Sequence, residues 1–483
     1  MKKSGSKIWI VVVMTILLDP SAGRLFTAQE SEENETAAVR PQLMTEEGML
    51  NVSFLSQLGT YFQQHFAFRD IMISANAELM QTFFRESSDD GVIVGSEGWL
   101  YYADSLSDYL GTHLMSDRQL QNLARSLSML DTCLEEHGIR LLYVPVPNKN
   151  TLYDEYMPYY DRVRVSEDHN LFRLYEQLEK ENVPYLNLYR TFSENPQILY
   201  HRTDSHWTNS GAALASMQIL QALGKETPDY TKEAYTVQTD FVGDLEKMLY
   251  PSHPKPEEEI YFDRGHSFIY TTEVESNYDP YIHTKNPDAS GSAVIYRDSF
   301  GNALLPFLAD GFSHAFFSRG GVYSLQDAEK NQADTVIIER AERLLWTSLG
   351  FPFLIPAVEA DLSEMDETQG EIVDSYTIRE TAADTPETDT YPSLIKNGRY
   401  LQLKGYLPET PMNTDCYLYA KFPDGRVYEA LPCSFLGENG WEEYGYCVNL
   451  DERVCAGQEL RVTIYAMDHR LDKKTDLHET IAG

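Results

Sequence analysis

The chain has 483 residues, of which 42% are hydrophobic and 24% charged, which is enough to bury a core and favours more than one domain. Against 75 Asp and Glu there are only 39 Lys and Arg, so the formal net charge is −36. A balance this acidic repels a phosphate backbone and an anionic membrane surface, and we therefore expect no nucleic-acid partner.

The first residues predict a location outside the cytoplasm. Three lysines within the first seven residues precede an apolar run over residues 8–18 and then several small residues, which is the layout of a secretory signal. The run is short for a membrane-spanning helix, which needs about 20 apolar residues, but an uncleaved anchor stays open as an alternative. We expect residues 1–26 to be a signal peptide or anchor, and the protein to be secreted or tethered to the outer face of the membrane.

Composition divides the rest of the chain into segments. Residues 27–50 are polar and acidic and are predicted to be a tether, and residues 361–391 are predicted to be a second acidic linker. Between them, residues 51–360 are predicted to form the main domain. Within it, residues 229–290 are rich in Tyr, Pro and acids and are read as an insertion over one end of a sheet. Residues 392–483 show alternating patterns that predict a small β-sandwich, a candidate carbohydrate-binding domain.

Helix and strand patterns alternate along the main domain. An amphipathic stretch over residues 54–84 and a short strand at 98–102 come first. Ser116 and Gln119 form a capping-box sequence before leucines at helical spacing, and a helix is predicted from there to Gly138. Further helices are predicted at 170–181 and 211–223, and strands at 140–145, 184–188, 292–296, 314–318 and 335–338. This alternation predicts an α/β fold with a mostly parallel sheet covered on both faces.

Cysteine usage agrees with an oxidising location. Four cysteines fall within 40 residues near the C-terminus: Cys416, Cys433, Cys447 and Cys455. They lack paired C-x-x-C spacing, so zinc is not expected, and one or two disulfides of undetermined pairing are predicted instead. Cys133, alone in a predicted helix, is expected to be a buried thiol.

Two segments carry residues suited to acyl transfer. Residues 203–211 (TDSHWTNSG) lie between a strand and a helix, and residues 294–302 (VIYRDSFGN) run from a strand into a helix. Ligands of α/β sheets bind at the carboxyl ends of the strands, where a helix N-terminus can stabilise an oxyanion. A serine is a poor nucleophile until a base takes its proton. We predict Ser299 as the nucleophile, His206 as its base and Asp204 as the residue that orients the imidazole.

Each motif also has a purely structural alternative. Asp204 and Ser205 would cap a turn and His206 would be a structural histidine, while Asp298 would begin an ordinary strand-to-helix turn. Metal binding by Asp204 and His206 is not favoured, because no third ligand motif is evident. The two motifs together, each at a strand end of one α/β domain, favour the catalytic interpretation.

These motifs resemble those of the extracytoplasmic SGNH-hydrolase-like proteins that include the DHHW family and the alginate O-acetyltransferases. The resemblance covers residues 50–350. It rests on Asp204-Ser-His-Trp207 and Asp298-Ser-Phe-Gly301, with support from Gly98-Trp-Leu-Tyr101 and Pro145-Val-Pro-Asn-Lys149. It implies an SGNH-like sheet and a triad in the permuted order Asp204, His206, Ser299.

The resemblance also implies a reaction, the transfer of acetyl groups to hydroxyls of an exported or cell-wall polysaccharide. Ser299 would take the acetyl group, and a sugar hydroxyl deprotonated by His206 would then attack the acyl-enzyme. The implied partners are a polysaccharide acceptor and a membrane-bound O-acyltransferase that supplies the acetyl group, and no cofactor or metal is expected. Two alternatives stay open: a carbohydrate acetyl esterase that uses the same triad with water, and a non-catalytic glycan-binding or assembly protein.

The sequence departs from the usual SGNH pattern around the oxyanion. Arg297 stands where Gly-Asp-Ser sequences have glycine, and the strand at 335–338 is followed by Glu339 where Gly-x-Asn-Asp is expected. The backbone N–H of Ser299 is one expected oxyanion donor. The candidates for a second donor or for substrate binding are Gly301, Asn302, Arg319 and Arg340. With Arg297, the last two are also candidates for a basic patch, whereas Lys149 is expected to be a solvated surface lysine.

Overall fold

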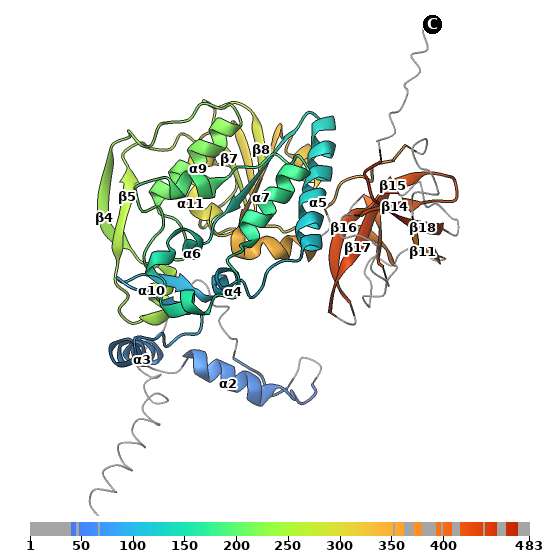
Figure 1. Cartoon of the computed structure of the whole chain (residues 1–483). Helices are drawn as coiled ribbons and strands as arrows, with labels where there is room; N and C mark the ends of the chain where they lie inside the picture. The colour runs from blue at the N-terminus through green and yellow to red at the C-terminus, as the bar shows by residue number, and fades with distance from the viewer. Residues whose placement is uncertain are drawn as a thin grey trace, which may run out of the picture. The chain divides into compact units, whose positions relative to one another are not determined.

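The structure, drawn in Figure 1, is a computed structural model of the chain. It falls into two compact units. It describes residues 40–44, 48–65, 68–350, 353–361, 371–378, 393–397, 399–407, 416–437, 440–451 and 460–471. The first unit comprises the chain up to Ala103 together with Arg202–Ser205 and Thr239–Glu257, and the second comprises the remainder. The predicted signal peptide or anchor and most of the two acidic segments lie outside the described residues. Among the described helices, none has the length and apolar character that a membrane span requires.

The described part of the first unit combines three helices with a small antiparallel sheet. Its elements are α2 (Phe54–His65), α3 (Arg69–Phe84), β1 (Val92–Val94), β2 (Leu100–Tyr102) and α10 (Asp244–Leu249). Its core joins Ala77 of α3 to Val92, Leu100 and two leucines of α10. The hydroxyl of Ser252 donates a hydrogen bond to Ser74 at 2.9 Å, which attaches the same face of α3. The predicted amphipathic stretch therefore forms two helices, and one face of α3 is buried.

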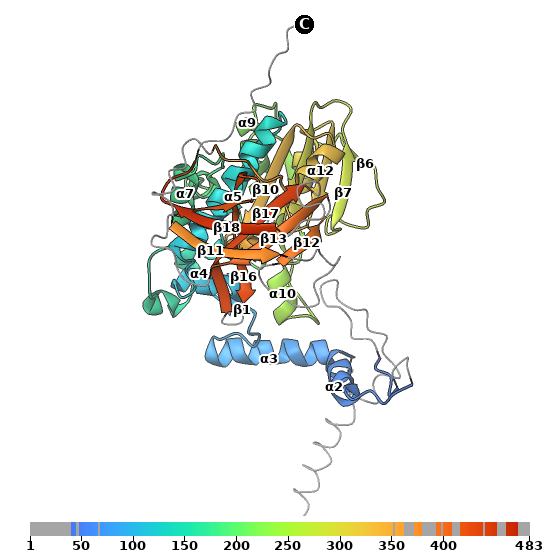
Figure 2. The same cartoon turned by 90° about the vertical axis from the view of Figure 1, so that its right-hand side faces the viewer.

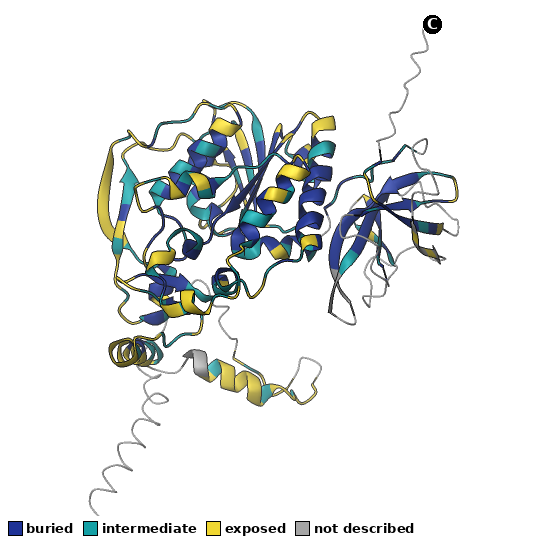
Figure 3. Cartoon of the chain, in the orientation of Figure 1, coloured by how far each residue is buried: buried dark blue, intermediate teal, exposed yellow. Residues whose placement is uncertain are grey.

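Much of α2 and α3 is exposed (Figure 3), and the exposed residues include large apolar side chains. They include Leu55, Leu58 and Phe62 on α2, and Met72, Leu79 and Phe83 on α3. At about 3.6 residues per turn each set lies on one side of its helix, and on α3 this side is opposite the buried one. Exposed apolar stripes of this kind are typical of contact surfaces.

The second unit is centred on a six-stranded sheet of strand order β3-β10-β8-β9-β7-β6. Its strands are β3 (Arg140–Val146), β6 (Ile269–Tyr270), β7 (Tyr281–Lys285), β8 (Ser292–Tyr296), β9 (His314–Ser318) and β10 (Thr335–Ala341). The first four strands in the sheet are parallel, and β7 and β6 add an antiparallel edge. The prediction of a mostly parallel sheet is confirmed, and the segment read as an insertion supplies β7 and β6, the two antiparallel strands at one edge.

Helices cover both faces of this sheet, as predicted (Figure 1). On one face lie α5 (Asp117–Glu136), α7 (Asn170–Lys180) and α12 (Leu325–Lys330), and on the other α8 (Leu188–Ser193), α9 (Asn209–Ala222) and α11 (Gly301–Ala309). Tyr143 and Ile338 belong to the first core, whereas their chain neighbours Val144 and Ile337 belong to the second. This division follows from the alternation of side chains along a strand.

Local signals account for where several of these helices begin and end. The predicted capping box is present, because Ser116 accepts the backbone N–H of Gln119 at 3.0 Å and the Gln119 side chain accepts that of Ser116. The strand predicted at 184–188 is reduced to one bridge between Tyr143 and Tyr185. The chain leaves the sheet there because the Asn187 side chain accepts the N–H of Arg190 at 3.0 Å and starts α8.

The C-terminal part of the second unit consists of two four-stranded antiparallel sheets (Figure 2). One contains β11 (Glu371–Ile378), β18 (Leu460–Met467), β14 (Tyr417–Lys421) and β15 (Val427–Glu429), and the other β12 (Ser393–Asn397), β13 (Tyr400–Tyr406), β17 (Gly440–Asp451) and β16 (Leu431–Gly437). Leu418 and Ile464 of the first sheet share a core with Leu403 and Val448 of the second. The region is therefore a β-sandwich, as predicted. The chain also contains α4 (Leu106–Leu110), α6 (Lys149–Leu152), β4 (Tyr235–Phe241) and β5 (Glu257–Phe262).

The disulfide prediction is wrong for the cysteines that the structure describes. Cys416, Cys433 and Cys447 are buried free thiols, Cys133 is buried outside any disulfide, and Cys455 lies outside the described residues. Cys433 pairs in register with Gly445, and Cys447 with Leu431, so the two thiols on β16 and β17 are not directly opposite. A disulfide requires Cβ atoms about 3.5–4.5 Å apart, which diagonal neighbours do not provide. Burial raises the pKa of Cys447 to about 12, which keeps that thiol protonated.

Candidate active site

Ser299 lies in the turn between β8 and α11, at the carboxyl end of the parallel strands. Asp298 shapes this turn, because its carboxylate accepts the backbone N–H of Phe300 at 2.9 Å. A carboxylate that binds the N–H two residues further along is a common turn-forming contact. The other carboxylate oxygen accepts the N–H of Ala341 at 2.7 Å and so ties the turn to the end of β10. The Ser299 turn is thereby held at the carboxyl end of the parallel strands.

His206 reaches Ser299 from the segment that precedes α9. Its Nε2 lies 2.8 Å from Ser299 Oγ, within hydrogen-bond distance for proton transfer. Trp207 is only 1% exposed and donates its indole N–H to the carbonyl oxygen of Phe300 at 3.1 Å. The Phe300 ring packs edge-on against His206 and Trp207, with centroid distances of 4.8 and 5.0 Å. These two aromatic residues therefore fasten the histidine segment to the serine turn.

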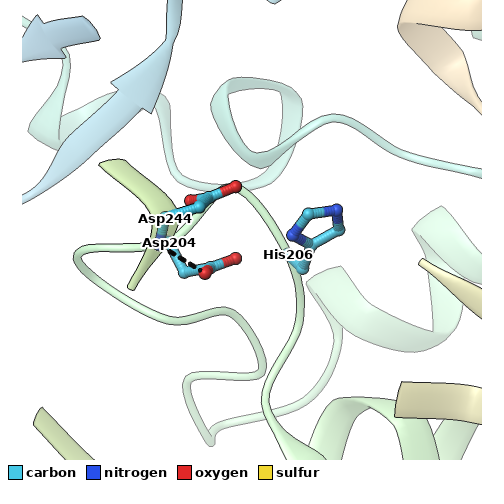
Figure 4. A group of neighbouring side chains, drawn as sticks. All are labelled: Asp204, His206 and Asp244. Carbon is cyan, nitrogen blue, oxygen red and sulfur yellow. Dashed lines mark hydrogen bonds between the residues drawn. The ribbon is translucent and has the colours of Figure 1, made fainter. Parts of the chain in front are cut away.

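Asp204 belongs to the first unit, where it is attached to the start of α10. Its Oδ2 accepts the backbone N–H of Asp244 at 2.8 Å, as the dashed line in Figure 4 shows. Asp244 in turn accepts the N–H and the hydroxyl of Ser205 at 2.8 and 2.6 Å. The backbone at position 243 approaches that of Thr203 so closely that glycine is required. A Cβ atom at position 243 would lie 2.1 Å from the carbonyl oxygen of Thr203. Asp204 is 6% exposed, so these bonds set the direction of a nearly buried carboxylate.

Replacing Gly243 with alanine is expected to lower the free energy of unfolding by about 1–3 kcal/mol, because the added methyl group has no room. Urea unfolding measures the change. Gly265→Ala is the matched control, since nothing lies within 4 Å of the Cβ atom it would add. Equal effects of the two substitutions would contradict the packing described for Gly243.

Among the described residues, Asp204, His206 and Asp244 are neighbouring side chains with potential metal-ligand atoms within 4.8 Å of one another (Figure 4). Sequence reasoning missed Asp244, whose only signal is a Gly-Asp pair before a helical pattern. Its carboxylate already accepts hydrogen bonds from Ser205 and from the N–H of Leu245. Such donors satisfy a partly buried carboxylate without a cation.

The four candidates for a second oxyanion donor separate into two pairs. Gly301 and Asn302 form the first turn of α11, directly after Ser299 and Phe300. Arg340 instead donates to the carbonyl oxygen of Leu344 and to the Thr347 hydroxyl. Arg319 is exposed and donates to the carbonyl oxygen of Tyr278 at 3.1 Å. The helix N-terminus therefore provides the better-placed donors.

Arg297 stands where Gly-Asp-Ser sequences have glycine, and its side chain has a structural role. Its side chain is 2% exposed and donates to the Asn302 side-chain oxygen and, at 2.9 Å each, to the carbonyl oxygens of Asn277 and Asp279. Because the oxygen of the Asn302 amide is bound to Arg297, the NH₂ group is the donor that this amide can offer to a ligand. The guanidinium of Arg297 faces protein acceptors, so it does not serve the basic patch for which it was a candidate.

A second polar cluster joins the loops that follow β3 and β10. The backbone N–H of Asn148 and the hydroxyl of Thr151 donate to Glu342 at 2.8 and 2.7 Å. The Asn148 amide also donates to Asp108, whose pKa is raised to about 7 by burial and by the charge of Glu342. Lys149 is 4% exposed, so the prediction of a solvated lysine is wrong. The loop that carries Lys149 is buried because Asn148 donates hydrogen bonds to Glu342 and to Asp108 in two neighbouring segments.

Fold and site define an α/β protein in which a serine and a histidine meet at the carboxyl end of a parallel sheet. Residues 92–261 match the family model described as "SGNH hydrolase-like domain, acetyltransferase AlgX". The resemblance inferred from the motifs is thereby confirmed for this part of the chain. The matched range contains Asp204 and His206 and ends before Ser299.

Two curated relatives are both named "Probable alginate O-acetylase AlgJ". The protein from Pseudomonas putida is 24% identical over 180 residues, 37% of this chain and 46% of the relative. The protein from Pseudomonas syringae pv. tomato is 26% identical over 209 residues, 42% of this chain and 52% of the relative. The chain therefore spans about half the length of the curated relatives it matches.

Two solved structures are also similar to this chain. Bacillus cereus PatB1 is 17% identical, with 53% of this chain and 96% of that chain covered and a TM-score of 0.43. A DHHW family protein from Eubacterium siraeum is 15% identical, with coverage of 53% and 93% and a TM-score of 0.42. These likenesses are too distant to add to the argument about function.

Proposed function

We propose that this chain is an O-acetyltransferase that moves an acetyl group to hydroxyls of a polysaccharide through an acetyl-Ser299 intermediate. The observation that carries the proposal is the 2.8 Å distance between His206 Nε2 and Ser299 Oγ. The SGNH-like match and the relatives named as alginate O-acetylases support the acetyl group and the polysaccharide.

The reaction has two balanced steps. First, His206 takes the Ser299 proton while Oγ attacks the carbonyl carbon of an acetyl ester, and the leaving group departs with that proton. Second, a sugar hydroxyl gives its proton to His206 and attacks the acetyl-serine, and Ser299 leaves and regains a proton. Asp204, two residues before His206, is the carboxylate proposed to orient the imidazole.

The negative charge of each tetrahedral intermediate requires donors beside Ser299. We assign this role to the backbone N–H groups of Ser299 and Gly301 and to the NH₂ group of Asn302. The contacts of Arg319 and Arg340 with other parts of the protein make them weaker candidates.

The wider setting of the reaction follows from the rest of the sequence. The N-terminal lysines and apolar run support an extracytoplasmic protein, secreted or tethered by residues 1–26. A membrane-bound O-acyltransferase would supply the acetyl group there. We assign the catalytic domain to residues 51–360 and a carbohydrate-binding role to the β-sandwich of residues 392–483.

The test uses the full chain with a chromogenic acetyl ester, with and without oligosaccharide acceptors. We expect acetylated oligosaccharide by mass spectrometry and faster chromophore release when acceptor is present, and neither in Ser299→Ala. Acetate release that does not respond to acceptor would identify an esterase. Glycan binding without turnover would contradict both enzymatic readings.

A further inference from the structure

The turn that carries Ser299 contains the buried carboxyl group of Asp298 and contacts a second one, that of Glu339 on β10. This strand lies between β3 and β8, and Glu339 is paired with Val144 of β3. Its side chain is 1% exposed, and its Oε2 accepts the backbone N–H of Asp298 at 3.0 Å. Among the described residues, no N–H or O–H group donates a hydrogen bond to Oε1 of Glu339. Two carboxyl groups therefore meet in the core beside the proposed nucleophile.

Asp298 is the member of this pair that has a hydrogen-bond donor at each carboxylate oxygen. Each of its oxygens accepts one backbone N–H, from Phe300 and from Ala341. Ionised carboxylates accept hydrogen bonds at both oxygens, and such bonds favour the charged form. Glu339 accepts at one oxygen only, which leaves the other able to hold a proton.

Among the residues that the structure describes, no positively charged side chain donates a hydrogen bond to Glu339. Arg297 and Arg340 are within electrostatic reach, but their hydrogen bonds go to other acceptors. The other titratable side chains within electrostatic reach of Glu339 are Tyr143 of β3, Tyr200 and Tyr323. Burial raises the pKa of each of these tyrosines, so they stay neutral. Burial first, and then the charge of Asp298, raises the pKa of Glu339 well above its ordinary value.

We propose that Asp298 and Glu339 share one proton, carried by Glu339, and that neutral Glu339 is a positioning residue for the turn that presents Ser299. Neutral Glu339 accepts the Asp298 N–H without placing a second charge beside the Asp298 carboxylate. Loss of the proton would put two like charges in contact in the core and weaken the turn. The inference rests on the proposed function only where it names Ser299 as the nucleophile.

The first test is the pH dependence of stability, which needs no enzymatic activity. The unfolded Glu339 ionises near its ordinary pKa of 4.5, whereas the folded protein keeps the proton to higher pH. The contribution of protonated Glu339 is complete below the unfolded pKa and is lost as pH rises toward the folded pKa. Glu339→Gln cannot ionise, so we expect its urea midpoint to rise relative to wild type as pH increases through that window. A difference that stays constant with pH would overturn the shared proton.

The second test is the pH profile of Ser299 acetylation. We expect the wild-type rate to fall at alkaline pH as Glu339 ionises, and Glu339→Gln to keep the neutral-pH rate but lose this alkaline decline. Glu429→Gln is the matched control, because burial also raises the pKa of Glu429, on β15 of the β-sandwich. It should leave the profile unchanged. Identical profiles for wild type and Glu339→Gln would exclude the positioning role.

These two tests also separate failure of the inference from failure of the proposed function. If wild type forms no acetyl-serine, the function fails, and the unfolding comparison still decides whether the proton is shared. If Glu339→Gln does not fold, infrared spectroscopy replaces the comparison of variants. The sample is the Glu429→Gln protein, because this substitution removes the carboxyl group of Glu429, whose pKa is also raised by burial. A protonated-carboxyl band should then persist above the pKa of Asp108, about 7. Absence of that band would overturn the proposal.

Discussion

Replacing His206 with glutamine is expected to slow acetylation of Ser299 by on the order of 10⁴-fold or more. The imidazole Nε2 lies 2.8 Å from Ser299 Oγ, and without a base the hydroxyl stays protonated and unreactive. The segment should keep its place, because Trp207 holds it to Phe300. Stopped-time intact-mass measurements of acetyl-enzyme give the rate, and thermal unfolding checks the fold.

His253→Gln is the matched control for this substitution. His253 is an exposed histidine that contacts Glu78 at 3.1 Å, in the first unit. We expect it to acetylate at the wild-type rate. A folded His206→Gln protein within about tenfold of wild type would show that another group removes the serine proton.

The second large effect is expected from Asp204→Asn, which should also reduce acetylation by on the order of 10⁴-fold. The amide oxygen can still accept the N–H of Asp244, so the local fold should survive. The substitution removes the negative charge that, in the proposed triad, favours one imidazole tautomer and stabilises the imidazolium. The same intact-mass rates measure the effect.

Asp244→Asn distinguishes the two neighbouring aspartates. Asp244 accepts hydrogen bonds from Ser205 and Leu245, so its substitution is expected to lower the urea midpoint more than the acetylation rate. A larger loss of rate in Asp244→Asn than in Asp204→Asn would transfer the orienting role to Asp244.

The parts of the fold that could be predicted are those with local signals. The strands at 292–296 and 314–318 were bounded correctly because buried parallel strands read as short continuous apolar runs. The segment at 184–188 is also apolar, but the cap formed by Asn187 starts a helix instead. The antiparallel edge could not be predicted, because the pairing of Tyr281 with Ser318 depends on contacts far apart in sequence.

The residues of the candidate site also divide into those with a local sequence signal and those without one. Asp204, His206 and Ser299 belong to short motifs that can be read along the chain. Asp244 and Glu339 have no motif, and they bond to Asp204 and Asp298 from 40 and 41 residues away. The surface prediction for Lys149 failed for a related reason, since burial depends on which loops pack together.

The most direct test of the acetyl-serine mechanism is the intact mass of the full chain after exposure to an activated acetyl ester. We expect wild type to gain one acetyl group, located at Ser299 by peptide mapping, and folded Ser299→Ala to gain none. An equal yield in Ser299→Ala, or an acetyl group on another residue of wild type, would contradict the account.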